Sequence, residues 1–261
     1  MKKTTLFKQY LQAPEIMLLP TAHDPLCAKI IERAGFKAVA CAGYVDSAAL
    51  IGAADVELLS LNAIADAVWR MADAVELPVF ADGTNAQGTV TSVRRTVQRL
   101  EKAGAAALML EDHVSSKLCR PLSGKRIVPA DEFVSKIKTA VDARVDQDLT
   151  ILARTDAIAV KGLGEAVERA HMCLEAGADW IFLQAESVDQ LREIPRLICA
   201  PTLANMIRGG RAPVVSPADL QAMGFAAVTL PNAFTYGFAR PARELASPPT
   251  YGPRASMRLS I

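Results

Sequence analysis

The sequence has few of the features that mark secreted, membrane or disulfide-rich proteins. Its five cysteines, at positions 27, 41, 119, 173 and 199, are odd in number and show no CxxC spacing. This favours a reducing compartment over a disulfide framework. No apolar run approaches eighteen residues, and polar residues interrupt the N-terminal twenty before they could form a signal sequence. We therefore expect a cytoplasmic protein with no membrane partner.

The chain also has no large excess of charge of either sign, because 29 basic residues balance 28 acidic residues and leave a net charge of +1. No global field then attracts nucleic acid or an anionic membrane, so a small-molecule partner is expected. The three histidines, at positions 23, 113 and 171, are scattered and predict no zinc cluster.

The remaining composition is that of a folded enzyme-sized domain. The chain has 261 residues, of which 51% are hydrophobic and 22% charged. This is enough apolar surface for a substantial core and excludes a wholly disordered chain. Single α/β barrels commonly have this length.

One junction recurs four times along the chain: the end of an amphipathic helix, a glycine, and a short apolar strand. The repeats are ERAGFKAVACAG at 32–43, EKAGAAALMLED at 101–112, LEAGADWIFLQA at 174–185 and QAMGFAAVTLPN at 221–232. Glycine is expected there because a helix that ends in the left-handed conformation disfavours a Cβ atom. The glycines are Gly35, Gly104, Gly177 and Gly224.

Further apolar strands are predicted between these junctions, which brings the total to eight. They lie at 15–20, 78–83, 149–156 and 201–205, and helices are predicted at 25–34, 61–75, 90–103, 130–143 and 164–176. Eight strands alternating with helices favour a closed (β/α)8 TIM barrel, and the glycine-rich phosphate turn of an open sheet is absent. We predict a single barrel domain over 1–261, with 232–261 an irregular Pro-rich C-terminal tail whose last helix is short, irregular or packed on a partner.

Polar side chains gather at the predicted carboxyl ends of these strands, where barrel loops converge on one mouth. They are His23, Asp24, Gly43, Tyr44, Asp82, Glu111, Asp112, Arg154, Asp156, Gln184, Glu186 and Asn205. Several carboxylates with one arginine suit a hard divalent cation and an anionic substrate. The pattern predicts an enzyme that uses Mg²⁺, with Mn²⁺ as a substitute, on a small carboxylate.

These motifs resemble the isocitrate lyase and phosphoenolpyruvate mutase superfamily over roughly residues 14 to 235. The resemblance is carried by Asp24 with Leu26 and Ala28, the Gly43 loop leading to GAAD at 52–55, FADG at 80–83, LEDH at 110–113, KLC and GK within 117–125, ARTDA at 153–157, EAVERA at 165–170, EAGADWIF at 175–182 and LANM at 203–206. Several motifs in the right order make a specific signal.

The resemblance implies roles for individual residues. Asp82 and Glu111 would hold the metal, and Lys117 and Cys119 match the loop that carries the catalytic cysteine in the lyase branch. Arg154 would be catalytic and bind substrate. The remaining substrate-binding positions are Ala42, Gly43, Tyr44, Asp82, Gln184 and Asn205.

The sequence departs from the family pattern at several of these positions. Thr84 stands where a second aspartate is usual, which predicts weaker metal binding because a hydroxyl brings no charge. Gln184 replaces the glutamate of lyases, and Leu118, Arg120 and Pro121 replace the residues that flank the cysteine. A changed substrate is the expected consequence.

Structural interpretations compete with the functional ones for several residues. Free cysteines are usually buried and inert, which we expect of Cys27, Cys173 and Cys199. Cys119 instead lies in a polar, cationic segment that would lower a thiol pKa. Asp82 could be a turn residue instead of a metal ligand, and Glu111 and Asp112 could cap the next helix. Arg154 could form a structural ion pair with Asp156 or Glu111.

The leading hypothesis is an Mg²⁺-dependent carbon–carbon lyase that cleaves a 2-hydroxy di- or tricarboxylic acid through an enolate, similar to 2-methylisocitrate lyase. Within enzymes the alternatives are P–C bond chemistry of the carboxyphosphonoenolpyruvate or phosphoenolpyruvate mutase kind and oxaloacetate decarboxylation. A barrel that binds a 2-oxo acid without turnover is the alternative outside enzymes. The resemblance also implies a homodimer or homotetramer, with the last helix exchanged between subunits.

Overall fold

The structure is a computed structural model that describes residues 1–115, 125–210, 212 and 214–246. The predicted positions of Lys117, Cys119, Arg120 and Pro121 therefore lie outside the described residues.

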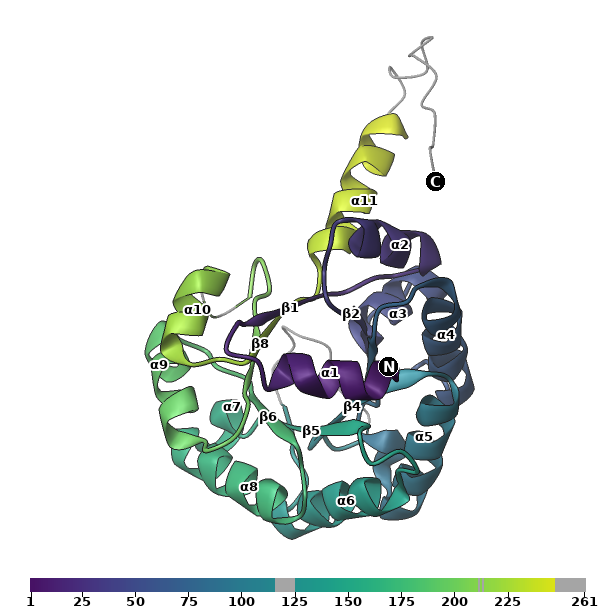
Figure 1. The fold of residues 1–261 in the computed structure, drawn as a ribbon. Coiled ribbons are helices and arrows are strands. Elements are labelled where there is room, and N and C mark those ends of the chain that lie inside the picture. The colour runs from purple at the N-terminus through teal and green to yellow at the C-terminus, as the bar shows by residue number, and fades with distance from the viewer. Residues whose placement is uncertain (116–124, 211, 213, 247–261) are drawn as a thin grey trace.

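Within the described part of the chain, eight parallel strands form the centre of the molecule (Figure 1). They are β1 (Met17–Pro20), β2 (Val39–Cys41), β3 (Val79–Asp82), β4 (Ala105–Glu111), β5 (Thr150–Thr155), β6 (Trp180–Leu183), β7 (Leu203–Asn205) and β8 (Ala227–Leu230). They pair in the orders β1-β8-β7 and β2-β3-β4-β5-β6. Single bridges between Thr21 and Ala40 and between Ile181 and Thr202 join the two sheets. The predicted barrel is confirmed.

Helices surround the strands on the outside of the barrel, as Figure 1 shows. They are α2 (Pro25–Arg33), α3 (Gly43–Ile51), α4 (Leu61–Ala74), α5 (Val90–Lys102), α6 (Ala130–Ala143), α7 (Ile158–Lys161), α8 (Leu163–Glu175), α9 (Val188–Leu197) and α10 (Pro217–Met223), with a 3₁₀ turn η1 (Ala86–Gly88). The five helices that the apolar spacing predicts are confirmed as α2, α4, α5, α6 and α8.

The glycines at the helix-to-strand junctions have the expected conformation. Gly35, Gly104, Gly177 and Gly224 have φ values of 84°, 95°, 100° and 104°. At Gly104 a Cβ atom would also lie 2.8 Å from the Cβ of Ala72. These residues end a helix in the left-handed region and turn the chain into the next strand.

A short N-terminal helix, α1 (Lys3–Leu11), crosses one end of the barrel (Figure 1). Its Phe7 is fully buried, with its ring centroid 6.5 Å from that of Phe80 and 5.6 Å from that of Trp180. The sequence pattern does not predict this helix, because only two of its nine residues, Phe7 and Leu11, are buried, and two apolar positions give a weak periodic signal. It covers the amino ends of the strands and leaves the carboxyl ends open to ligands.

The irregular tail predicted from residue 232 is wrong for its first part. A helix of 13 residues, α11 (Ala233–Leu245), projects from the barrel (Figure 1). Pro241 lies inside it, and none of its residues is buried. An exposed helix tolerates this proline because water can satisfy the carbonyl group that loses its donor. The prolines in the tail therefore misled the prediction.

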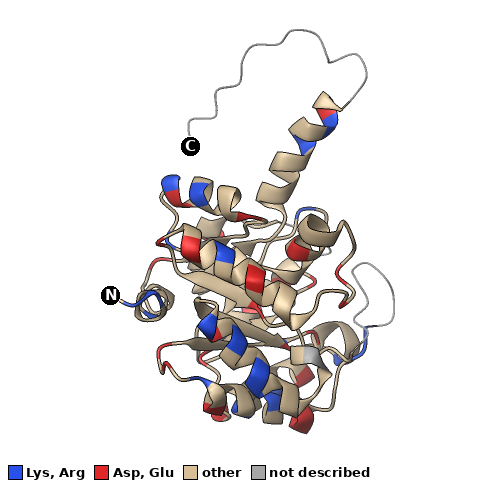
Figure 2. Cartoon of the chain, turned by 90° about the vertical axis from the view of Figure 1, so that its right-hand side faces the viewer, with Lys and Arg blue, Asp and Glu red and all other residues tan. Residues whose placement is uncertain are grey.

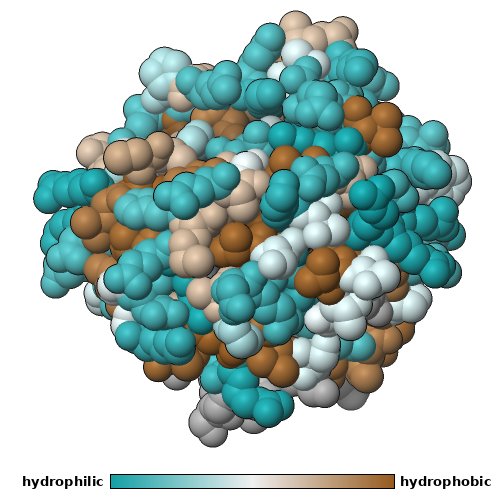
Figure 3. All heavy atoms as spheres, turned by 90° about the horizontal axis from the view of Figure 1, so that it is seen from below, coloured by the Kyte–Doolittle hydropathy of each residue, from teal (hydrophilic) through white to brown (hydrophobic). Residues whose placement is uncertain are grey.

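The described helices carry both signs of charge side by side, as Figure 2 shows, in keeping with the balanced composition. Exposed pairs such as Arg70 with Asp66 and Lys138 with Asp142 are spaced one helical turn apart. On the face drawn in Figure 3, hydrophilic and hydrophobic residues are interspersed. Within the described residues, no helix is both long enough and apolar enough to span a membrane.

Candidate active site

The site residues predicted from the sequence lie together at one end of the barrel. Gly43 follows β2, Asp82 ends β3, Glu111 ends β4 and Arg154 lies near the end of β5. Gln184 follows β6, and Asn205 ends β7. Because all eight strands are parallel, these positions share the carboxyl end of the barrel.

A backbone cradle fixes Asp82. One carboxylate oxygen, Oδ2, accepts a hydrogen bond from the amide of Gly43 at 3.1 Å, and Oδ1 accepts one from the amide of Thr84 at 2.8 Å. Asp82 is 4% exposed. The alternative of a local turn residue explains only the second bond, since the first reaches across to the neighbouring strand.

The same cradle contains a second carboxylate. A Cβ atom placed on Gly43 would lie 3.3 Å from Asp82 Oδ2, 3.6 Å from Asp55 Oδ1 and 3.7 Å from the methyl carbon of Thr84. These three side chains thus surround one point, where an added Cβ atom would crowd Asp82 Oδ2. Ala42, the residue before α3, and Gly43 bring the backbone of this loop to the mouth of the barrel.

The donor set fits a hydrated Mg²⁺ ion better than a metal held by many side chains. Asp82, Asp55 and Glu111 are buried carboxylates at the same edge of the barrel. No three His, Cys, Asp or Glu side chains among the described residues converge closely enough to ligate one ion directly. Mg²⁺ is typically bound by one or two carboxylates and keeps several waters for exchange with substrate oxygens.

Arg154 is held between two carboxylates. Its Nη1 lies 3.0 Å from Glu111 Oε2, and its Nε lies 3.1 Å from Asp156 Oδ1. The guanidinium carbon is 5.1 Å from the ring centroid of Phe182. Burial alone would lower the pKa of Arg154, but Asp156 and Glu111 together raise it. Both structural pairs foreseen for this arginine exist, and they keep it charged and oriented.

Asp156 is the centre of a buried charge network, of which the sequence predicts only the pair with Arg154. Its Oδ2 lies 2.8 Å from His113 Nε2 and accepts a hydrogen bond from Lys125. Burial would raise the pKa of Asp156, but Arg154, His113 and Lys125 hold it well below its usual range. His113 thus has a hydrogen-bonding role in this network.

Asp112 has a structural role, although it is not the helix cap that the sequence suggests. Its Oδ1 accepts the amide of Asp156 at 3.0 Å, and its Oδ2 accepts the hydroxyl of Thr155 at 2.5 Å and contacts Arg169 at 3.3 Å. Burial raises the pKa of Asp112. Neither it nor Glu111 caps the next helix, because α6 begins after Pro129.

Two amides meet on the opposite side of the mouth. Asn205 Nδ2 donates to Gln184 Oε1 at 3.3 Å, and Gln184 Nε2 donates to the carbonyl oxygen of Ala185 at 3.3 Å. Tyr44 lies in the first turn of α3, just after β2, but its hydroxyl lies 2.8 Å from that of Tyr236 in α11. Its side chain therefore contacts α11, and its backbone stays at the mouth.

A buried acid beside this site is invisible in the sequence pattern. Asp46 is 1% exposed and accepts a hydrogen bond from the thiol of Cys41 at 3.2 Å. Burial, and to a smaller extent the charges of Asp82 and Asp55, raise the pKa of Asp46 to about 7 against the opposing effect of the Cys41 hydrogen bond. The tertiary fold alone brings these carboxyl groups together.

The other cysteines bear out the structural interpretation only in part. Cys27 and Cys173 are buried, and burial raises their pKa values to about 11 and about 12. Cys199 is exposed, so its predicted burial is wrong. It lies in the bend that precedes β7, where its side chain faces away from the core.

Comparison with known proteins gives a consistent result. The family model described as phosphoenolpyruvate phosphomutase matches residues 7–247. A 2,3-dimethylmalate lyase of Eubacterium barkeri is 40% identical over 90% of this chain and 82% of its own length. A 2-methylisocitrate lyase of Aeropyrum pernix is 37% identical over 87% of this chain and 73% of its own length.

Solved structures agree with these sequence matches. A crystal structure of 2,3-dimethylmalate lyase superposes with a TM-score of 0.90 at 29% identity, covering 99% of this chain and 92% of that chain. A phosphonopyruvate hydrolase in complex with oxalate and Mg²⁺ superposes with a TM-score of 0.80 at 27% identity, covering 98% and 93%.

Proposed function

The chain belongs to the phosphoenolpyruvate mutase and isocitrate lyase superfamily, and on this premise we propose that it is an Mg²⁺-dependent carbon–carbon lyase. Its substrate class is a small 2-hydroxy di- or tricarboxylic acid. The observation that carries the proposal is the convergence of Asp82, Glu111 and Arg154 at one edge of the barrel, in a chain whose relatives are named as lyases.

The reaction breaks the bond between C2, which bears the hydroxyl, and C3. The hydroxyl loses its proton, C2 becomes the carbonyl carbon of a 2-oxo acid, and the electron pair of the broken bond goes to C3. That carbanion survives as an enolate of its own carboxylate. It must then receive one proton to give the second product.

The described residues would bind and orient such a substrate. Arg154 is half-buried and ion-paired on two sides, so it presents a fixed positive charge to the oxyanion that develops. The backbone of Ala42, Gly43 and Tyr44 would hold a carboxylate of the substrate, and the amides of Gln184 and Asn205 would contact its distal part.

A bound Mg²⁺ ion would act as a Lewis acid at the substrate oxygens. Asp82 would hold it, with Glu111 nearby. Glu111 forms an ion pair with Arg154, so the positive charge of the arginine lies beside the Glu111 carboxylate. The substrate is therefore expected to lie between the cradle of Asp82 and the guanidinium group.

Cys119 would donate the proton to the carbanion, with Lys117 keeping the local field positive. These roles rest on the match of Lys117 and Cys119 to the lyase motif. Both residues lie outside the described part of the chain.

The test is turnover of a panel of substrates. Purified protein with Mg²⁺ is incubated with 2,3-dimethylmalate, 2-methylisocitrate, oxaloacetate and phosphonopyruvate, and release of 2-oxo acid is followed. Cleavage of a hydroxy acid that stops in EDTA supports the proposal. Turnover of phosphonopyruvate alone would establish P–C chemistry in its place, and oxalate binding without any turnover would establish a non-catalytic barrel.

A Cys119→Ser variant tests the proton donor, with Cys199→Ser as the matched control because Cys199 is an exposed cysteine far along the chain. We expect a fall in kcat of at least 100-fold for Cys119→Ser, since general acid catalysis typically contributes this much. The control should keep wild-type turnover. Equal activity of the two variants would remove Cys119 from the mechanism.

We also propose that the protein is a homodimer or homotetramer in which α11 packs on a neighbouring copy. The helix buries none of its own residues, and Tyr236, Phe238 and Leu245 on it are 50%, 36% and 57% exposed. Light scattering should give a mass that is a multiple of 27.9 kDa. A monomer at micromolar concentration would contradict this.

A further inference from the structure

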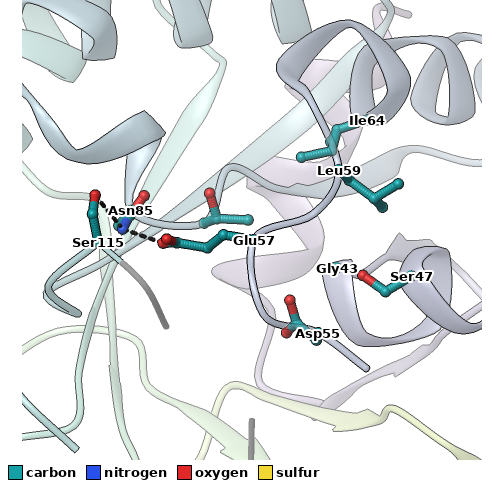
Figure 4. Close-up of a pocket in the computed structure, with 9 residues that line it drawn as sticks. Gly43, Ser47, Asp55, Glu57, Leu59, Ile64, Asn85 and Ser115 are labelled. Carbon is teal, nitrogen blue, oxygen red and sulfur yellow. Dashed lines mark hydrogen bonds between the residues drawn. The ribbon is translucent and has the colours of Figure 1, made fainter. Parts of the chain in front are cut away.

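A small cavity lies beside the cradle of Asp82. It has a volume of about 140 Å³, and its lining includes Gly43, Asp55, Glu57, Thr84 and Asn85. Figure 4 shows Asp55 and Glu57 entering from one loop, with the Glu57 carboxylate directed toward Asn85. Two acidic side chains therefore reach the side of the site where Thr84 brings no charge.

The backbone of Glu57 is in a conformation that a side chain normally disfavours. Its φ is 65°, in the left-handed region. Among the described residues, the other non-glycine residues with a positive φ are Thr84 and Ala86. All three lie on the two loops that enclose the cavity or its edge. Strained backbone of this kind clusters at functional sites, where it fixes the direction of a side chain.

One loop grips both Asp82 and Glu57. The amide of Thr84 donates to Asp82 Oδ1 at 2.8 Å, and the side chain of the next residue, Asn85, donates to Glu57 Oε1. Asn85 is 1% exposed, so this donor is held in place by packing. The position of Glu57 is thus linked to that of Asp82 through two consecutive residues.

We propose that Glu57 supplies the negative charge that Thr84 lacks, and that it holds the hydrated divalent cation electrostatically from the cavity side. This inference deepens the proposed function and rests on it, because it concerns the same cation. A carboxylate that does not ligate Mg²⁺ still strengthens its binding by attracting the ion and its waters. The negative charge that the family pattern places at position 84, after β3, would then lie on the loop that carries Asp55.

The experiment measures Mn²⁺ affinity directly, without turnover. Free Mn²⁺ is followed by electron paramagnetic resonance in titrations of the full chain, with and without oxalate. The variants are Glu57→Gln, Thr84→Asp and the double variant. Glu57→Gln keeps the acceptor oxygen for Asn85 and removes only the charge, and Thr84→Asp suits a left-handed residue because aspartate tolerates that region.

We expect Glu57→Gln to weaken Mn²⁺ binding about 10- to 100-fold, the range usual for residues that support a metal without ligating it. The double variant should regain most of the loss, because it returns a carboxylate to position 84. Glu168→Gln, an exposed glutamate on α8, is the matched control and should bind as the wild type does. Circular dichroism melts check that each variant is folded.

Unchanged Mn²⁺ affinity in Glu57→Gln would overturn the inference and leave the proposed function intact. A loss that Thr84→Asp fails to restore in a folded double variant would also overturn it, since the charge would then not be interchangeable. Absence of Mn²⁺ binding by the wild-type protein would overturn both the metal-dependent function and this inference.

Discussion

Replacing Asp156 by asparagine should destabilise the protein strongly. The carboxylate has no exposed surface, and Arg154, His113 and Lys125 all point at it. Asparagine keeps one acceptor oxygen for Arg154 but turns an amide toward His113 or Lys125. The lysine would then be a partly buried cation without its counter-ion.

The magnitude follows from the geometry of this network. Removing one partner of a buried ion pair typically costs about 3 to 5 kcal/mol. The individual bonds from charged donors, at about 1.5 to 3 kcal/mol each, would sum to more. Glu111 remains 3.0 Å from Arg154 and retains part of the compensation, so the lower figure is the better expectation. A change of 3 kcal/mol corresponds to roughly 6 to 12 °C in Tm for a domain of about this size.

Urea denaturation of the wild type and Asp156→Asn at pH 7.5 measures the difference in unfolding free energy. Asp142→Asn is the matched control, because Asp142 pairs with Lys138 on an exposed helix face and should change stability by less than about 1 kcal/mol. Oxalate affinity should also fall in Asp156→Asn, since Arg154 loses its orientation. A variant within about 1 kcal/mol of the wild type would refute the claim that this network is a net support of the site.

Three further predictions follow from single contacts. Gly43→Ala should lower Mg²⁺ and oxalate affinity at least about tenfold in calorimetry, because its Cβ would lie 3.3 Å from Asp82 Oδ2; unchanged affinity would contradict the cradle. Without metal, stability should fall as pH rises from about 4 to about 7, because the unfolded chain releases the Asp46 proton at lower pH than the folded protein, whose pKa is about 7. At about 1.4 kcal/mol per pKa unit the loss approaches 4 kcal/mol, and Asp46→Asn should flatten the urea-derived pH profile. Phe7→Ala should cost about 3 to 5 kcal/mol in the same assay, since the ring is fully buried against Phe80 and Trp180; a loss below 1 kcal/mol would show that α1 contributes little.

The local chemistry of the chain determined the barrel and the residues at its mouth. Helix ends are marked by Gly35, Gly104, Gly177 and Gly224, because glycine, which has no Cβ atom, adopts the left-handed conformation without strain. An apolar strand follows each of them. Asp82, Glu111 and Arg154 stand at strand ends, and in a parallel barrel all strand ends of one polarity meet. Their common location therefore needs no tertiary information.

Only the tertiary structure decided which of these groups interact. The network of Asp156 joins β5 to a histidine 43 positions and a lysine 31 positions earlier in the chain, and no periodic pattern encodes such contacts. Asp46 is 1% exposed because of its surroundings in the folded chain, which no periodic pattern records. The direction of Glu57 depends on a backbone torsion that glutamate does not favour by itself. Sequence patterns record the preferences of single residues and short segments, whereas burial and charge pairing arise from the surroundings that the folded chain supplies.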